Sequence, residues 1–196
     1  SKMRHGAVRF RTGSPDFSAI PLTEYDWERS IYRKVSEMVP DDAPTPYGPR
    51  VTITTYVDAN LCHDMITGRS VTGVLHLLNQ SIIDYYTKKQ PRVETATYGA
   101  EYMAARTATE KFMDLRTVLR YLGVNISGPT YMFGDNSTVV ISSSTSKARL
   151  HKRHVILSFH RVCEAIASKI LYFIFIPGPN NPADILSKHW VFQQIC

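Results

Sequence analysis

The chain has 196 residues, a formal net charge of +6 and a hydrophobic content of 43%, which is enough to bury a core. No run of 18 apolar residues occurs, so the sequence predicts neither a membrane span nor a membrane partner. The first residues lack the apolar stretch of a secretory signal. The three cysteines are widely spaced without a CxxC pair, which predicts free thiols rather than a disulfide framework or a zinc site.

Residues 1–49 differ in composition from the rest of the chain. They hold six of the eleven prolines, and a proline-rich stretch cannot form a regular helix or a central strand. We interpret this part as a tether or connection segment, with one short helix predicted at residues 22–38. The domain boundary is placed at Pro49, so that residues 50–196 form the folded domain.

The folded part alternates between strand and helix patterns. Strands are predicted where β-branched and apolar residues cluster, at residues 51–58, 70–78, 81–87, 130–134 and 170–176. Helices are predicted from apolar spacing and start signals, at residues 97–123, 139–143, 151–169 and 182–188. Asn79-Gln80 joins two of the strands as a hairpin, so the first three strands should be antiparallel. The fold class is therefore α/β, with a five-stranded mixed sheet flanked by helices.

Four acidic residues are predicted at the ends of these elements. Asp58 and Asp135 end strands, whereas Glu101 and Asp184 lie in the first turns of helices. Only the fold could bring them together, and four facing carboxylates would repel one another unless cations lay between them. Oxygen ligands favour hard divalent cations, with Mg²⁺ the best fit and two ions the arrangement suited to phosphodiester displacement. Ordinary strand-end and helix-cap aspartates are the other reading that the spacing allows.

Basic residues concentrate in residues 144–170, which contain six basic residues and one acid. A stripe of this kind can be a solvated face, but it is also the footprint of a partner with a phosphate backbone.

Seven short motifs between residues 52 and 190 occur in one order: YVDAN, GRSVTG, YTKKQ, AEYMA, GDNS, KRHVILSFHR and NPADILSK. Together they resemble the ribonuclease H domain of copia-type (Pseudoviridae) retrotransposon Pol polyproteins. Residues 1–49 are similar to the segment that follows the reverse transcriptase in these polyproteins, but their motifs are less specific. The resemblance implies a ribonuclease H-like fold and an intracellular location, in a cytoplasmic virus-like particle.

The resemblance also implies an activity. It predicts a metal-dependent endonuclease that hydrolyses the RNA strand of RNA·DNA hybrids, leaving a 3′-hydroxyl and a 5′-phosphate. The implied cofactor is a pair of Mg²⁺ ions, for which Mn²⁺ can substitute, and the implied metal ligands and catalytic residues are Asp58, Glu101, Asp135 and Asp184. The implied partners are the RNA·DNA hybrid and the reverse transcriptase domain of the same polyprotein.

Several polar residues are candidates for contact with nucleic acid. They are Arg69, Ser70, Lys88, Lys89, Asn136, Ser137, Arg149, Lys152, Arg153 and His154. The loop basics could bind phosphates or be only solvated, and Asn136 and Ser137 could meet 2′-hydroxyls or simply cap a helix.

The sequence departs from the family pattern in places. Family members often have a second glutamate two residues before the catalytic one, where this chain has Gly99. Residues 176–183 contain no histidine, unlike the corresponding loop of many cellular ribonucleases H. Two other functions stay open: a catalytically inert connection or hybrid-binding module of a reverse transcriptase, and an integrase-like strand-transfer core.

Overall fold

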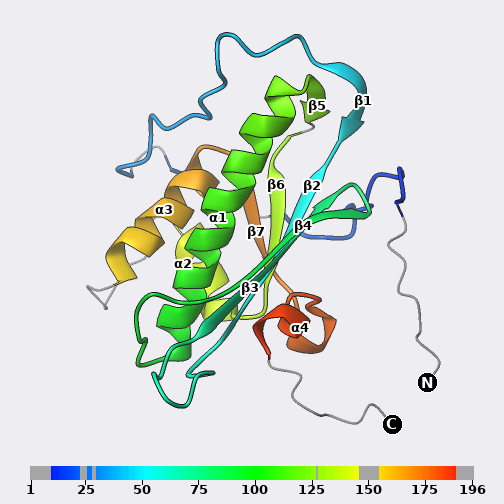
Figure 1. Ribbon diagram of the computed structural model, residues 1–196. Helices are drawn as coiled ribbons and strands as arrows, with labels where there is room; N and C mark the ends of the chain where they lie inside the picture. Colours follow the sequence, from blue (N-terminus) through cyan, green and yellow to red (C-terminus); the bar gives the residue numbers. More distant parts are fainter. Residues whose placement is uncertain (1–9, 23–25, 28–29, 127, 146–154, 189–196) are drawn as a thin grey trace, which may run out of the picture.

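A five-stranded sheet forms the centre of the computed structural model, which describes residues 10–22, 26–27, 30–126, 128–145 and 155–188 (Figure 1). In spatial order β4-β3-β2-β6-β7, the strands span Ser81–Lys89, Val71–Leu78, Ile53–Asn60, Thr130–Gly134 and Leu171–Phe175. The pairs β2–β3 and β3–β4 are antiparallel, whereas β2–β6 and β6–β7 are parallel. The predicted mixed sheet with three antiparallel strands first is confirmed.

The two faces of this sheet are covered differently. The helices α1 (Thr97–Tyr121), α2 (Ser137–Ser144) and α3 (Ile156–Ala167) lie together against one face (Figure 1), where their buried apolar side chains share a core with Val57 and Val74. Neighbouring residues of a strand point to opposite faces, so Gly73 faces away from this core. The short helix α4 (Asp184–Ser187) packs there, against β2, β3 and β4. None of the described helices is long and apolar enough to cross a membrane.

Two features of the first fifty residues differ from prediction. Strand β1 (Tyr47–Val51) pairs in parallel with β5 (Val124–Ile126) in a separate two-stranded sheet, which the sequence pattern does not reveal because both strands are short. The helix predicted at residues 22–38 is wrong in its described part, since residues 30–38 form turns and irregular chain. Ile31 is 78% exposed there although neighbouring Tyr32 packs against the core, so the apolar residues expected on one helix face are not buried together.

Residues before Pro49 nevertheless contact the rest of the chain. The Phe17 ring lies 4.4 Å from that of Tyr131 on β6. The backbone N–H of Arg11 donates to the Ser81 hydroxyl at 2.6 Å, where β4 begins. The boundary at Pro49 stays a prediction, but part of the segment preceding it packs on the sheet.

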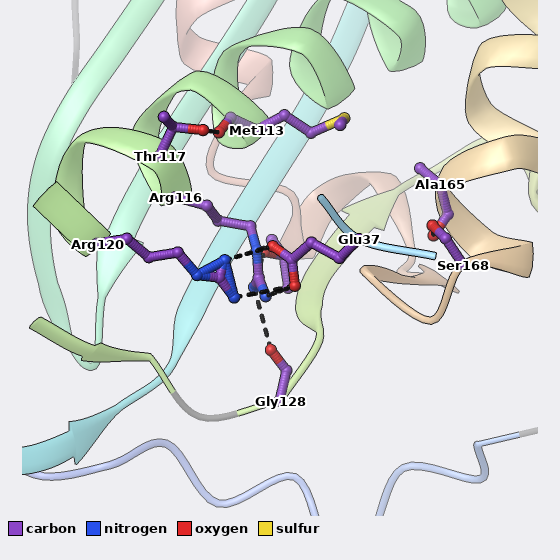
Figure 2. Close-up of polar contacts among 9 residues, drawn as sticks. Glu37, Met113, Arg116, Thr117, Arg120, Gly128, Ala165 and Ser168 are labelled. Carbon is purple, nitrogen blue, oxygen red and sulfur yellow. Dashed lines mark hydrogen bonds and ion pairs between the residues drawn. The ribbon is translucent and has the colours of Figure 1, made fainter. Parts of the chain in front are cut away.

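Glu37 joins this segment to α1 through a network of ion pairs (Figure 2). Its carboxylate accepts two hydrogen bonds from Arg116, at 2.8 and 2.9 Å, and two from Arg120, at 2.7 and 2.9 Å. The Arg116 side chain is only 4% exposed and also donates to the carbonyl of Gly128 at 3.0 Å. A buried guanidinium needs a counter-charge, so Glu37 ties the N-terminal segment to the last turns of α1.

The substitution Glu37→Gln is expected to lower the free energy of unfolding by about 3 kcal/mol, because it leaves the Arg116 charge buried without its carboxylate. Urea unfolding of the full chain measures this. The matched control is Glu110→Gln, which breaks the Arg106–Glu110 pair, nearly half exposed on both sides, and should change the free energy by less than about 0.5 kcal/mol. Equal effects of the two substitutions would show that the Glu37 contact is not structural.

Candidate metal and catalytic site

Two of the four predicted acids come from adjacent parallel strands. Tyr56 of β2 pairs with Phe133 of β6, so two residues further along the chain Asp58 of β2 and Asp135, the residue that follows β6, lie at the same level. The sequence placed Asp58 at the end of its strand, but β2 continues to Asn60 and pairs Asp58 with Gly73 of β3. The register of β2 and β6 therefore holds two carboxylates side by side.

The third acid, Glu101, comes from the first turns of α1. Gln90 fixes the start of this helix above β3, because its Nε2 donates to the carbonyl of Ala100 at 2.8 Å and to the Thr72 hydroxyl at 3.0 Å. Glu101 is thereby directed to the end of the sheet. One carboxylate oxygen from each of Asp58, Glu101 and Asp135 lies within 4.8 Å of the other two.

This proximity changes the acidity of the three groups. Burial, reinforced by the negative charges of Asp58 and Asp135, raises the pKa of Glu101 to about 9. Burial also raises the pKa of Asp58 and Asp135, and each feels the neighbouring carboxylates. The Ser187 hydroxyl opposes the shift at Asp58 by donating a short hydrogen bond to its Oδ2. Because burial and mutual repulsion make ionisation of these three carboxyl groups unfavourable, a cation bound between them would stabilise the site.

The fourth acid, Asp184, is carried by α4 on the other face of the sheet. This helix can approach closely because β3 has Gly73, where an added Cβ would lie 2.8 Å from the Ala183 carbonyl and 2.9 Å from the Ser187 amide nitrogen. Asn181 fixes the preceding loop, since its side-chain amide donates to the Val57 carbonyl at 2.9 Å. Together with the Ser187 bond to Asp58, these contacts attach α4 to β2 and β3.

All four acids line one open cavity of about 400 Å³. Asp184 is not part of the three-acid group. Its Oδ1 forms an ion pair with Lys188 Nζ at 2.5 Å. Asn136 and Ser137 line the same cavity. The Asn136 side chain also caps α2 by accepting from the Val139 N–H at 3.2 Å, so the predicted capping role is observed beside a position at the cavity wall.

The predicted loop basics lie in a second depression, of about 650 Å³, between β4 and α1. It is lined by Arg69, Lys88 and Lys89 together with Arg106 and Lys111 of α1. Ser70 differs from them, because it is fully buried and its hydroxyl accepts from the Cys62 N–H at 3.3 Å. Ser70 therefore supports the loop and offers no exposed group to a phosphate. The other four candidates, Arg149, Lys152, Arg153 and His154, lie outside the described residues.

Family members often carry a second glutamate where this chain has Gly99, and the packing around Gly99 explains why a glycine fits there. A Cβ at this position would lie 2.9 Å from the carboxyl carbon of Glu94, whose side chain is buried against the start of α1. A larger residue would displace Glu94. Sequence reasoning missed Glu94, Gly73, Ser187 and Lys188, although the last two belong to the NPADILSK motif from which only Asp184 was selected.

Known proteins resemble this chain in sequence. It is 27% identical over 133 residues to the retrovirus-related Pol polyprotein from transposon TNT 1-94 of Nicotiana tabacum, which covers 68% of this chain and 10% of the polyprotein. It is 24% identical over 143 residues to the Pol polyprotein from transposon RE2 of Arabidopsis thaliana, covering 72% and 10%. No protein-family model matches the sequence. The resemblance to transposon Pol polyproteins is confirmed, and the chain spans about a tenth of the length of these relatives.

Solved structures resemble it in fold. The N-terminal ribonuclease H domain of a Mycobacterium tuberculosis protein matches with a TM-score of 0.54 and 13% identity, covering 70% of this chain and 91% of that one. Ribonuclease H1 of Halobacterium salinarum matches with a TM-score of 0.53 and 17% identity, covering 71% of this chain and 95% of that one. LC11-RNase H1, solved in complex with an RNA/DNA hybrid, matches with a TM-score of 0.53 and 18% identity, covering 69% of this chain and 93% of that one. The fold is therefore that of ribonuclease H.

If this site catalyses hydrolysis, Gly73→Ala is expected to lower the rate by more than about tenfold, because the new methyl group would push α4 away from the sheet and move Asp184 and Ser187. Cleavage rates measured beside melting curves test this. Gly128→Ala, at a position where an added Cβ meets no atom within 4 Å but the backbone has a positive φ, should cost stability without a comparable loss of rate. Full activity in Gly73→Ala would contradict the role of this close approach.

The pH dependence of stability should reveal the Glu101 carboxyl. Its pKa is about 9 in the folded chain and near its ordinary 4.5 when unfolded, so the folded state holds the extra proton between these values. The free energy of unfolding should therefore fall as pH rises from about 5 to about 9 in EDTA. Glu101→Gln should flatten this slope and raise stability at pH 7 by roughly 1–3 kcal/mol.

Urea unfolding at stepped pH provides the measurement, with Glu110→Gln as the control for loss of an exposed α1 acid. Stability that rises across this interval, or an unchanged slope in Glu101→Gln, would show that Glu101 is not held as a protonated acid.

Proposed function

We propose that this chain hydrolyses the RNA strand of RNA·DNA hybrids, as the ribonuclease H part of a retrotransposon Pol polyprotein. The observation that carries the proposal is the group of Asp58, Glu101 and Asp135, whose carboxylate oxygens meet within 4.8 Å on a ribonuclease H fold. The neighbour solved with an RNA/DNA hybrid supports the same substrate class.

The donor set fits divalent metal ions. The three grouped ligands offer only carboxylate oxygens, which suit Mg²⁺ and Mn²⁺ better than soft metals. Asp58, Glu101 and Asp135 would hold a first ion, and Asp184 across the cavity would complete the site for a second. A pair of bound ions supplies electrostatic stabilisation to the attacking and leaving oxygens of a phosphodiester displacement.

The chain's own contribution is to hold these ligands in place. The Ser187 hydroxyl donates a hydrogen bond to Asp58 Oδ2 and so fixes the orientation of that carboxylate. Asn181 fixes the loop before Asp184 by its bond to the Val57 carbonyl. Ligands held in advance lose little freedom when the substrate binds, which favours the reaction.

Recognition of the hybrid would use two surfaces. Asn136 and Ser137 at the cavity wall would meet 2′-hydroxyls, the groups that distinguish RNA from DNA. Arg69, Lys88 and Lys89 in the depression beside α1 would hold backbone phosphates, with an affinity that falls as salt rises. Arg149, Lys152, Arg153 and His154 remain proposed contacts of the same kind.

The partner in the same polyprotein would be a reverse transcriptase, whose DNA synthesis creates the hybrid that this domain removes. The similarity to long Pol polyproteins supports this arrangement. An inert connection module is the second candidate function. The acids that meet in one cavity argue against it, because an inert copy would have no reason to keep a destabilising group of carboxylates.

The direct test is cleavage of a labelled RNA·DNA hybrid in Mg²⁺ beside single-stranded RNA and duplex DNA. Only the hybrid should be cut, and chelation should stop the reaction. Asp58→Asn should abolish cleavage, and Glu101→Gln and Asp135→Asn should nearly do so, because each removes a ligand of the grouped site. Asp184→Asn should leave the most residual activity, partly recovered by Mn²⁺.

Glu164→Gln is the matched control, since it neutralises a partly exposed helix acid, paired with Arg161, that lines neither this cavity nor the depression beside α1, and it should cleave like the unmodified chain. Full activity of Asp58→Asn, or Mg²⁺-independent cleavage, would refute the proposed function.

A further inference from the structure

Lys188 places a positive charge at the wall of the acidic cavity. It follows α4 directly, and its ammonium lies 2.5 Å from Asp184 Oδ1. The side chain is 52% exposed, yet it lines the cavity and its charge also acts on Asp58 and Asp135. Neighbouring Ser187 is fixed by its bond to Asp58, so the backbone that carries Lys188 is anchored at the site.

Asp184 differs from the other acids in its contacts. The other three have carboxylate oxygens within 4.8 Å of one another, whereas the Asp184 carboxylate forms an ion pair with Lys188. A divalent ion bound through either oxygen of the Asp184 carboxylate would lie close to the ammonium group that now contacts Oδ1, and the two like charges would repel each other. The ion and the lysine therefore compete for the negative charge of this carboxylate.

We propose that Lys188 competes with the second divalent ion for the Asp184 carboxylate and so sets the Mg²⁺ concentration at which this part of the site fills. The inference rests on the proposed function, because it assumes that the cavity binds divalent ions. It makes Lys188 a positioning residue: it occupies Asp184 when no second ion is bound and moves toward solvent when one binds. The half-exposed side chain leaves room for that movement.

Lys89 provides a matched control. It too is a half-exposed lysine, 54% accessible, in an ion pair with an aspartate, Asp64, at 2.8 Å. It lines the depression between β4 and α1 and not the acidic cavity. Replacing either lysine by methionine removes one charge and one ion pair, but only Lys188→Met changes the charge beside Asp184.

The experiment is titration of the full chain with Mg²⁺ alone, without nucleic acid, followed by calorimetry and by the melting temperature. Lys188→Met should bind the weaker Mg²⁺ about tenfold more tightly than the unmodified chain, because a competing cation is removed. Lys89→Met should bind as the unmodified chain does. In EDTA, Lys188→Met should melt lower, since Asp184 then lacks its counter-charge, and Mg²⁺ should restore the difference.

Lys188→Arg keeps the charge and should keep the weaker Mg²⁺ affinity, and Lys188→Gln replaces the methionine variant if that protein does not melt cooperatively. Equal Mg²⁺ affinities in Lys188→Met, Lys89→Met and the unmodified chain would overturn the role of Lys188 while leaving the metal site intact. A chain that neither binds Mg²⁺ nor is stabilised by it would overturn the metal site itself, and the Lys188 inference with it.

Discussion

Three carboxylates within 4.8 Å of one another are the constraint on which the arrangement of this chain depends. Their ionisation is unfavourable, as the pKa of Glu101 near 9 indicates, so other contacts must hold them together. The parallel register of β2 and β6 aligns Asp58 with Asp135, and Gln90 fixes the start of α1 so that Glu101 meets them. The large buried core between the sheet and α1 supplies the stability that this repulsion reduces.

A second constraint acts from the opposite face of the sheet. Helix α4 reaches Asp58 only because Gly73 removes a side chain from the middle of β3. The approach lets Ser187 donate to Asp58, and it brings Asp184 and Lys188 to the cavity. One glycine thus connects the packing of a four-residue helix to the geometry of the acids, and the chemistry proposed for this site depends on that contact.

The sequence predicted the elements whose patterns are local. The alternating strands and the long helix follow from spacing and start signals, and the sheet matches the predicted fold class, although β2 continues past Asp58 to Asn60. Contacts set by tertiary structure escaped prediction. The sequence around Gly73 does not show that α4 packs against it. Likewise, the sequence around Glu37 does not show that its carboxylate pairs with Arg116 of α1. The helix expected at residues 22–38 is wrong in its described part, because Trp27 and Tyr32 pack on the core from irregular chain while Ile31 stays exposed.

The most direct test of the account is a crystal structure of the full chain grown with Mn²⁺, in which the anomalous signal locates each ion. The account predicts a strong Mn²⁺ peak within bonding distance of oxygens from Asp58, Glu101 and Asp135, and a weaker one beside Asp184. Mn²⁺ bound elsewhere on the molecule, with the acidic cavity free of any peak at saturating concentration, would contradict it.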